Sequence, residues 1–364
     1  MSHTQALVEE SISKIIEYLE ESYTAEISAL SIDQIFLPSL FKTTMEKLLN
    51  KLGYHLAKAE TIRKLERKTA VSSEKLWAIQ TLFSVLKDCV QFDKVYDLLA
   101  DEASREVFDW RIRVRVGLSF IGRASYQLFP SPYEEQVFLK GIEEIKKRGK
   151  NDWFKIDRFR LKSTPGAIFG SFISEQYRFP GIVEPEKGDW VLDIGGLFGE
   201  TSFWFSKYVG EEGRVFCFEP VPENYCVLLE NLSKNGTKNI VPENLAVGET
   251  SGEIRISGSG ATAARSDSGK IVSCTSIDDF VRNNNLARVD MIKMDIEGYE
   301  MNALQGAVET LKDFKPKLAI ASYHGGEDLV RIPLFMESLG LGYKMYLRHF
   351  APSLGETILF AITT

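Results

Sequence analysis

The 364-residue sequence lacks the features of several protein classes. No run of 18 consecutive apolar residues occurs, so no membrane span is expected. The first residues show no basic segment followed by an apolar one, so we expect no secretory signal and a cytoplasmic protein. The four cysteines form no Cys-x-x-Cys pair, which argues against a zinc site and favours free thiols.

Positive charge is also scarce, with 44 Lys and Arg against 51 Asp and Glu. Nucleic-acid binding requires a basic surface, so the composition disfavours a nucleic-acid partner. One basic run contains Lys146, Lys147, Arg148 and Lys150. It is either a local basic patch or a solvated helix end, where positive charge suits the helix dipole, and we favour the helix end.

Residues 1–115 show the three- and four-residue apolar spacing of helices. The first apolar face contains Val8, Ile12, Ile15, Ile16 and Leu19. Similar spacing recurs at 45–52, 76–86 and 95–110, and no catalytic constellation stands out. We predict a helical region that covers the substrate or joins two copies in a homodimer. Residues 116–176 form a junction of undefined structure, with a strand or loop at 153–161.

From residue 177 to residue 364 the pattern changes to that of an α/β domain. Short apolar runs at 191–194, 215–218, 291–294 and 318–321 are typical of buried parallel strands. Helical segments are predicted at 201–208, 222–235 and 301–314, and a closing hairpin at 342–350 and 357–363. This alternation predicts a doubly wound sheet covered by helices on both faces.

The first predicted strand runs into a glycine-rich turn that contains Asp193, Gly195, Gly196 and Gly199. Glycines allow positive φ and the close approach of a ligand, which in such sheets binds beyond the carboxyl ends of the strands. The Asp-x-Gly-x-x-x-Gly spacing differs from the Gly-x-Gly-x-x-Gly of nicotinamide-binding proteins and argues against such an oxidoreductase. Asp193 is expected to orient the turn and to meet the ammonium of an amino-acid-like cofactor.

Carboxylates follow two further strands. Glu219 ends the run at 215–218, where a carboxylate can accept both ribose hydroxyls of an adenosine; the alternative is a surface acid. Asp295, Glu297 and Glu300 follow the run at 291–294, where they serve either the cleft or the first turn of a helix. His324 follows the run at 318–321 and is a candidate proton acceptor, with His349 the weaker candidate.

Taken together, these stretches resemble the FkbM family of S-adenosylmethionine-dependent methyltransferases. The likeness covers about residues 177–363 and rests on DIGGLFGETS, FEPVPENYCVLLENLSKN, AVGETSGEI, TSIDDF and IKMDIEGYEMNALQGA in this order. It implies a class I methyltransferase (Rossmann-like) fold with a seven-stranded, mostly parallel sheet. The family usually has Ala-Asn after the first glycine of the turn, whereas this chain has Gly196 and Leu197.

The resemblance also implies roles for single residues. Asp193, Gly195 and Gly199 shape the turn around the methionine part of the cofactor, and Gly196 belongs to the same turn. Glu219 holds the ribose, and Ala246 lies near the adenine. Asp295 counts among the cofactor-binding residues as well as among the catalytic candidates.

The expected activity is methylation of a hydroxyl on a sugar, glycan or other small natural-product-like acceptor. His324 or Asp295 acts as the base, and Glu297 orients one of them or the acceptor. A divalent cation on Asp295 and Glu297 ranks second, because no further ligand stands at a convincing spacing. The alternatives are a binding protein with a vestigial cofactor pocket and a nucleic-acid methyltransferase, which the acidic composition disfavours.

Overall fold

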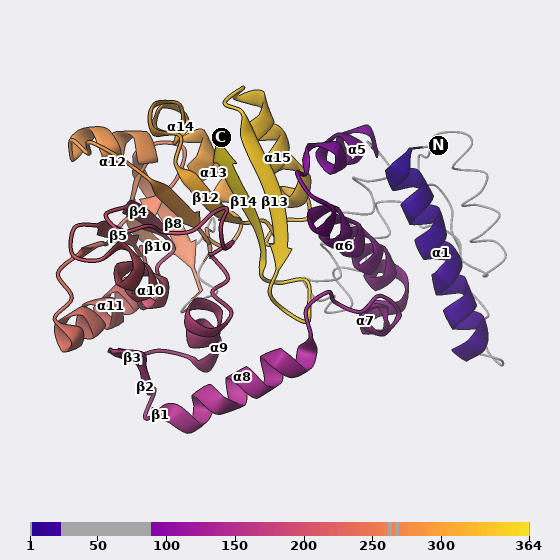
Figure 1. Ribbon diagram of the computed structural model, residues 1–364, viewed down its shortest axis with the longest axis horizontal. Coiled ribbons are helices and arrows are strands. Elements are labelled where there is room, and N and C mark those ends of the chain that lie inside the picture. Colours follow the sequence, from indigo (N-terminus) through magenta and orange to yellow (C-terminus); the bar gives the residue numbers. More distant parts are fainter. Residues whose placement is uncertain (1, 23–88, 259, 261–263, 266–268, 364) are drawn as a thin grey trace. The chain divides into compact units, whose positions relative to one another are not determined.

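The computed structural model describes residues 2–22, 89–258, 260, 264–265 and 269–363 (Figure 1). The helical segments predicted at 45–52 and 76–86 lie outside the described residues. The chain divides into two compact units, Met1–Tyr96 with Phe108–Pro130 and Asp97–Val107 with Ser131–Thr364. Each unit is considered separately below.

The described part of the first unit is helical, as predicted. On α1, the apolar residues Val8, Ile12 and Ile15 are buried. Thr4 is buried as well and donates from Oγ1 to Asp93 Oδ1 over 2.5 Å, which ties α1 to α5. None of the helices described in the chain is both long and apolar enough to cross a membrane. The helices that contribute are α1 (His3–Ser22), α5 (Cys89–Leu98), α6 (Glu102–Ile121), η1 (Gly122–Ala124) and α7 (Ser125–Leu128).

The second unit is built on a seven-stranded sheet of order β13-β14-β12-β11-β4-β5-β6. Strand β14 runs antiparallel to β12 and β13, and the other pairs are parallel. The predicted buried strands and the closing hairpin are therefore confirmed. The strands are β4 (Trp190–Ile194), β5 (Arg214–Phe218), β6 (Ile240–Glu243), β11 (Met291–Met294), β12 (Lys317–Ala321), β13 (Tyr343–His349) and β14 (Thr357–Thr363).

Helices cover both faces of this sheet (Figure 1). Phe203 of α10 and Leu228 of α11 share one buried cluster with Val215 of β5. Phe280 of α12 instead packs on Phe218, with ring centroids 4.7 Å apart. Because side chains alternate along a strand, Val215 and Phe218 face opposite sides of the sheet. The helices are α10 (Glu200–Val209), α11 (Pro222–Asn235), α12 (Ile277–Asn283), α13 (Glu300–Gln305), α14 (Val308–Phe314) and α15 (Asp328–Ser338).

The single helix predicted at 301–314 is wrong, because the segment forms two helices, α13 and α14. The break lies at Gly306, where a Cβ atom would stand 2.3 Å from the Gly248 carbonyl oxygen. Asp278 then caps the start of α14 by accepting hydrogen bonds from the backbone N–H of Glu309 and Thr310, at 3.0 and 2.8 Å. These long-range contacts end the first helix despite its continuous apolar periodicity.

The junction that the sequence left undefined contains a helix followed by a small sheet. Lys146, Lys147 and Arg148 occupy the last turn of α8, as the helix-end interpretation predicts. Asn231 Nδ2 donates to the Lys162 carbonyl over 3.0 Å and so ties the small sheet to α11. The elements are α8 (Glu135–Arg148), β1 (Gly149–Lys150), β2 (Trp153–Ile156), β3 (Phe159–Lys162), α9 (Pro165–Ile168) and η2 (Phe169–Ile173).

A second small sheet, of order β7-β10-β8-β9, interrupts the alternation between β6 and α12. Ala246, Ile256 and Val272 belong to its own buried cluster. The sequence pattern did not predict this sheet, whose short strands are half-exposed. The strands are β7 (Ala246–Val247), β8 (Gly252–Ser257), β9 (Ala264–Arg265) and β10 (Lys270–Thr275).

Candidate active site

Two positions in the turn between β4 and α10 leave no room for a side chain. Gly195 has φ 82°, and a Cβ atom there would stand 1.9 Å from the Asp295 carbonyl oxygen. A Cβ at Gly196 would stand 2.2 Å from Cys217 Sγ. Both backbone N–H groups donate to the Phe218 carbonyl, at 3.0 and 2.9 Å. The turn is therefore fixed against the carboxyl end of β5 and presses closely on β11.

Asp193 holds this turn in position through hydrogen bonds to the start of α10. Its side chain is fully buried, and Oδ2 accepts hydrogen bonds from Thr201 Oγ1 (2.6 Å) and Ser202 Oγ (2.5 Å) at the start of α10. Its Oδ1 lies 3.0 Å from Lys293 Nζ. The carboxylate does not line the pocket described below. The contacts thus agree with the predicted orienting role and offer no route to the ammonium of a cofactor.

Lys293, the partner of Asp193, is a buried residue beside the glycine turn that the sequence analysis did not single out. It lies in the middle of β11 and is 1% exposed. Its Nζ donates to the Gly195 carbonyl over 2.7 Å and stands 5.0 Å from the centroid of the Tyr177 ring. Burial lowers the pKa of Lys293, but the charges of Asp193 and Asp295 outweigh it and raise the pKa overall. A lone cation inside an apolar strand was the signal that could have identified it.

A pocket of about 130 Å³ opens beside the glycine turn. Its walls come from the carboxyl ends of β4, β5 and β11 and from the second small sheet. Of the predicted site residues, Asp193, Gly196, Gly199 and His324 do not line it. The predicted residues that do line the pocket are Gly195, Glu219, Ala246, Asp295 and Glu297.

Glu219 presents a carboxylate that the protein holds on three sides. Its Oε2 accepts from the Leu197 N–H over 3.0 Å, and its Oε1 accepts from the Val221 N–H (2.9 Å) and from Asn224 Nδ2 (3.2 Å). Burial raises the pKa of Glu219 to about 7, although these hydrogen bonds favour the ionised form. The alternative of a simple surface acid does not hold, since Glu219 is 5% exposed.

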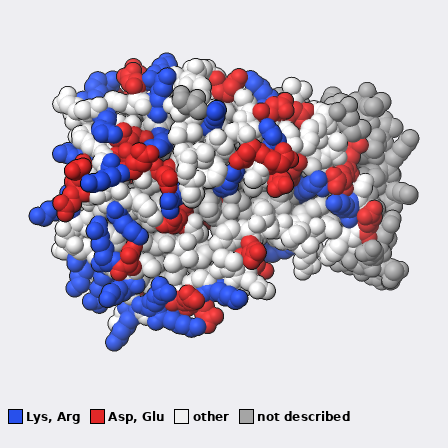
Figure 2. Space-filling model, in the orientation of Figure 1, with Lys and Arg blue, Asp and Glu red and all other residues white. Residues whose placement is uncertain are grey.

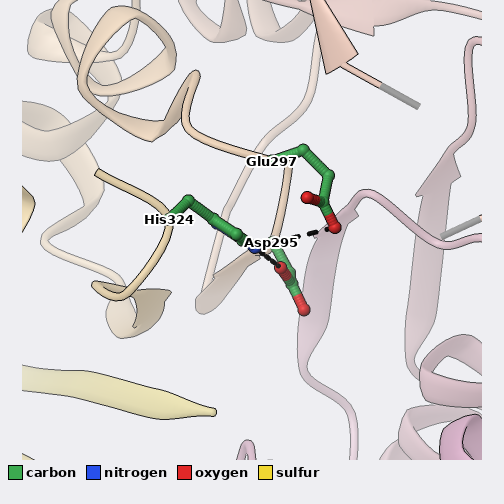
Figure 3. A group of neighbouring side chains, drawn as sticks. All are labelled: Asp295, Glu297 and His324. Carbon is green, nitrogen blue, oxygen red and sulfur yellow. Dashed lines mark ion pairs between the residues drawn. The ribbon is translucent and has the colours of Figure 1, made fainter. Parts of the chain in front are cut away.

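Asp295, Glu297 and His324 meet at the edge of the same pocket (Figure 3). His324 Nε2 lies 3.4 Å from Asp295 Oδ1 and 3.7 Å from Glu297 Oε1. Asp295 and Glu297 follow β11, and His324 follows β12, its parallel neighbour. Parallel neighbours end at the same edge of a sheet, which explains why residues so distant in sequence come together.

The surroundings of His324 are strongly acidic. Its Nδ1 lies 2.9 Å from Oε1 of Glu300, a carboxylate that is 1% exposed. Burial lowers the pKa of His324, but the hydrogen bond to Glu300 and the charges of Asp295, Glu300 and Glu297 raise it to about 10. These carboxylates keep His324 protonated at neutral pH. His349, the weaker candidate, has its Nδ1 2.7 Å from Thr357 Oγ1 on the neighbouring strand.

Two tyrosines hold Asp295, and the sequence analysis predicted neither. The Tyr177 hydroxyl donates to Asp295 Oδ2 over 2.5 Å, and the Tyr323 hydroxyl lies 3.3 Å from Asp295 Oδ1. Tyr323 also lies 3.4 Å from Glu356 Oε2, which accepts from Gln176 Nε2 over 2.8 Å. Burial and the neighbouring acids raise the pKa of both tyrosines well above the usual value, so both keep their protons and donate.

The strand order of the sheet and the glycine turn beside Glu219 define a class I methyltransferase fold. Residues 193–345 match the model of the methyltransferase FkbM domain. This part of the chain is therefore similar to the S-adenosylmethionine-dependent methyltransferase domain of the FkbM family, in agreement with the resemblance seen in the sequence.

Two known proteins are similar to this chain. The crystal structure of a methyltransferase FkbM from Methylobacillus flagellatus is 20% identical, with a TM-score of 0.51, and the match covers 88% of this chain and 70% of that one. The hexuronic acid methyltransferase AglP of Haloferax volcanii is 25% identical over 150 residues, which is 40% of this chain. The match spans 60% of the length of AglP, so the acceptor of AglP describes AglP alone.

Proposed function

We propose that this chain transfers the methyl group of S-adenosylmethionine to a hydroxyl oxygen of a sugar, a glycan or a similar small acceptor. The observation that carries the proposal is the placement of two different acidic sites on one pocket. Glu219 lines one end, and Asp295 and Glu297 line the other. A cofactor that carries both a diol and a reactive sulfonium requires such a division.

In this proposal Glu219 accepts the two ribose hydroxyls. The three hydrogen bonds that it receives from the protein fix its position before the cofactor arrives. Ala246, together with Ile254 and Ile256 of β8, offers an apolar wall for the adenine. The methionine part would then lie along Gly195, which lines the pocket.

Methyl transfer is an in-line displacement. The acceptor oxygen forms a bond to the methyl carbon, the carbon–sulfur bond breaks with its electron pair on sulfur, and S-adenosylhomocysteine leaves as a neutral sulfide. The acceptor proton must go to a nearby group, and we assign it to Asp295 because His324 already holds a proton. Tyr177 and Tyr323 keep Asp295 in place, and His324 balances the charge of the acids.

The acidic edge of the pocket favours a hydroxyl over a carboxylate as acceptor. A carboxylate is already ionised and needs no proton acceptor, and Asp295 and Glu297 would repel it. A sugar ring as the acceptor agrees with the name of the relative AglP, whose identity to this chain is 25%.

A nucleic-acid acceptor receives less support. The face in Figure 2 shows Lys and Arg intermixed with Asp and Glu over the second unit. The net charge of the chain is −7. Phosphate backbones bind to surfaces with a surplus of positive charge.

The test is methyl transfer from isotope-labelled S-adenosylmethionine to three matched sugars: methyl glucoside, glucuronic acid and the methyl ester of glucuronic acid. We expect a labelled product that survives mild alkali, because an ether is stable there and an ester is hydrolysed. A product that alkali cleaves would assign the reaction to a carboxylate. A folded chain that binds no S-adenosylmethionine would instead support the vestigial pocket.

A further inference from the structure

We propose that Asp295, Glu297 and His324 bind a first-row divalent cation of the Mn²⁺ type at the acceptor end of the pocket. The role of the cation in methyl transfer rests on the proposed function, but its binding does not. One ligand atom from each residue lies within 4.8 Å of the other two. Among the described residues this is the group of His, Cys, Asp and Glu side chains that meets the spacing of a metal site.

The distances are close to those of a coordination sphere. Ligands about 2.1 Å from a metal stand about 3.0 Å apart at right angles and about 3.4 Å apart in a tetrahedron. His324 Nε2 stands 3.4 Å from Asp295 Oδ1 and 3.7 Å from Glu297 Oε1. The Glu297 carboxylate lies within 4.8 Å of the other two ligand atoms, and its side chain is 34% exposed, so it would have to turn slightly toward a bound ion.

An independent observation comes from His324 itself. Its side chain is 6% exposed, and Nε2 has no hydrogen-bond partner among the described residues although it points at two carboxylates (Figure 3). The opposite nitrogen, Nδ1, lies 2.9 Å from Glu300 Oε1, which also accepts from the Ile296 N–H over 2.9 Å. A carboxylate behind the imidazole is the usual outer partner of a metal-bound histidine, because it fixes the ring and directs Nε2 at the metal. A cation that binds here replaces the Nε2 proton that His324 holds in its absence, so binding releases a proton.

The two acids are positioned in a similar way. The Tyr177 hydroxyl occupies Oδ2 of Asp295, while Oδ1, which lies 3.3 Å from the Tyr323 hydroxyl, is directed at His324. Glu297 has φ 56°, a conformation that a residue with a side chain rarely adopts. Such strain is concentrated at functional sites, where the surrounding structure maintains it.

Charge and ligand chemistry select the kind of ion. Three carboxylates, of Asp295, Glu297 and Glu300, surround one imidazole, so the cluster has an excess of negative charge. A ligand set with one nitrogen suits Mn²⁺, Fe²⁺, Co²⁺ or Zn²⁺ better than Mg²⁺ or Ca²⁺, which prefer oxygen alone. A cation held by Asp295, Glu297 and His324 would lower the pKa of an acceptor hydroxyl beside it. Because Asp295 would then hold the cation, the acceptor proton would pass to water instead of to Asp295. The oxygen would bond to the methyl carbon while the carbon–sulfur bond breaks with its electron pair on sulfur.

The experiment is a titration of the full chain with Mn²⁺ after chelator treatment, without S-adenosylmethionine, followed by electron paramagnetic resonance of the free ion. We expect one site per chain. His324→Ala and Glu297→Gln should each weaken binding at least tenfold, and the exposed Asp313→Asn should leave it unchanged. Two variants are used, each checked for folding by circular dichroism, so that an unfolded one does not decide the result.

Absence of a site in the wild-type chain, or equal binding in His324→Ala, overturns the cation proposal. S-adenosylmethionine binding is measured calorimetrically on the same samples. If the chain binds S-adenosylmethionine but not Mn²⁺, the cation proposal is wrong and the proposed function stands. If the chain binds Mn²⁺ but not S-adenosylmethionine, the proposed function is wrong and the cation site stands.

Discussion

Two strand ends on the same pocket carry carboxylates, and the protein treats them differently. At the end of β5, Glu219 receives hydrogen bonds only from neutral donors, namely two backbone N–H groups and Asn224. At the end of β11, Asp295 and Glu297 both face Nε2 of His324. The first arrangement suits a neutral diol, because the carboxylate keeps its capacity to accept further hydrogen bonds. The second suits a proton or a cation, because its negative charge is in excess.

The comparison shows that position on the sheet and residue type do not define a role by themselves. Glu219 and Asp295 each follow a buried parallel strand, and each belongs to a recognisable sequence motif. The partners that fold around each one decide whether it serves binding or chemistry. The predictions below separate these two roles.

The largest effect is expected at His324. Replacement by Ala removes the cationic partner of Asp295 and Glu297, so kcat should fall about 10²-fold or more, because Asp295, the assigned proton acceptor, loses the charge that positions it. The affinity for S-adenosylmethionine should stay within a factor of about three, because His324 does not line the cofactor pocket. Steady-state kinetics and calorimetry measure the two quantities.

The matched control is His349→Gln, at a second buried histidine that contacts Thr357. This change should affect thermal stability and leave kcat per folded molecule unchanged. A normal kcat in the His324→Ala enzyme would show that His324 takes no part in the reaction.

The next effect is expected at Glu219, where only binding should change. Glu219→Ala removes two charge-assisted hydrogen bonds to the ribose, worth about 1.5–3 kcal/mol each before compensation, so the Kd for S-adenosylmethionine should rise about 100-fold. Glu219→Gln keeps one acceptor oxygen and should lose less. Calorimetry provides the Kd, and the exposed Glu253→Gln on the small sheet provides the control. An unchanged Kd in Glu219→Ala would show that the ribose binds elsewhere.

The sheet and the cofactor end of the pocket were predictable from sequence, because their signals are local. Buried parallel strands are continuous apolar runs, and the turn at Gly195 requires glycine on steric grounds. Both signals lie within a few residues of the group that they describe. The split of the helix at Gly306 was not predictable, since its cause is the backbone of a distant segment.

At the acceptor end of the pocket, the residues with local signals were predictable from the sequence, and those with long-range contacts were not. Asp295, Glu297 and His324 follow predicted strands, so their meeting could be foreseen from the parallel order. Tyr177 lies outside any motif, and its contact with Asp295 spans 118 residues of sequence. A hydrogen bond between residues so far apart produces no pattern in the sequence. The raised pKa of His324 depends on its contacts with Glu300, Asp295 and Glu297 and was equally hidden.

A smaller effect should follow from pH. Burial raises the pKa of Glu219 to about 7, and only its ionised form accepts both ribose hydroxyls. As the pH falls below about 7, the carboxylate becomes protonated, and the Kd for S-adenosylmethionine should rise by up to about tenfold per pH unit. Above pH 7 the Kd should be constant. Calorimetry from pH 5.5 to about 8.5 checks this, and Glu219→Gln should flatten the profile; a wild-type profile that is flat below pH 7 would contradict the assignment.

The smallest effect concerns the turn itself. Leu197 has φ 51° where the family usually has Asn, and its N–H donates to Glu219 Oε2 over 3.0 Å. A left-handed conformation costs a branched side chain more than it costs Asn, so Leu197→Asn should stabilise the domain by about 0.5–1 kcal/mol. Thermal unfolding measures this, with Gly199→Ala, at φ 94°, expected to change stability in the opposite direction. A loss of stability in Leu197→Asn would mean that the apolar contacts of Leu197 in the pocket wall outweigh the strain, and that this chain has adapted the cofactor end of its pocket to a leucine.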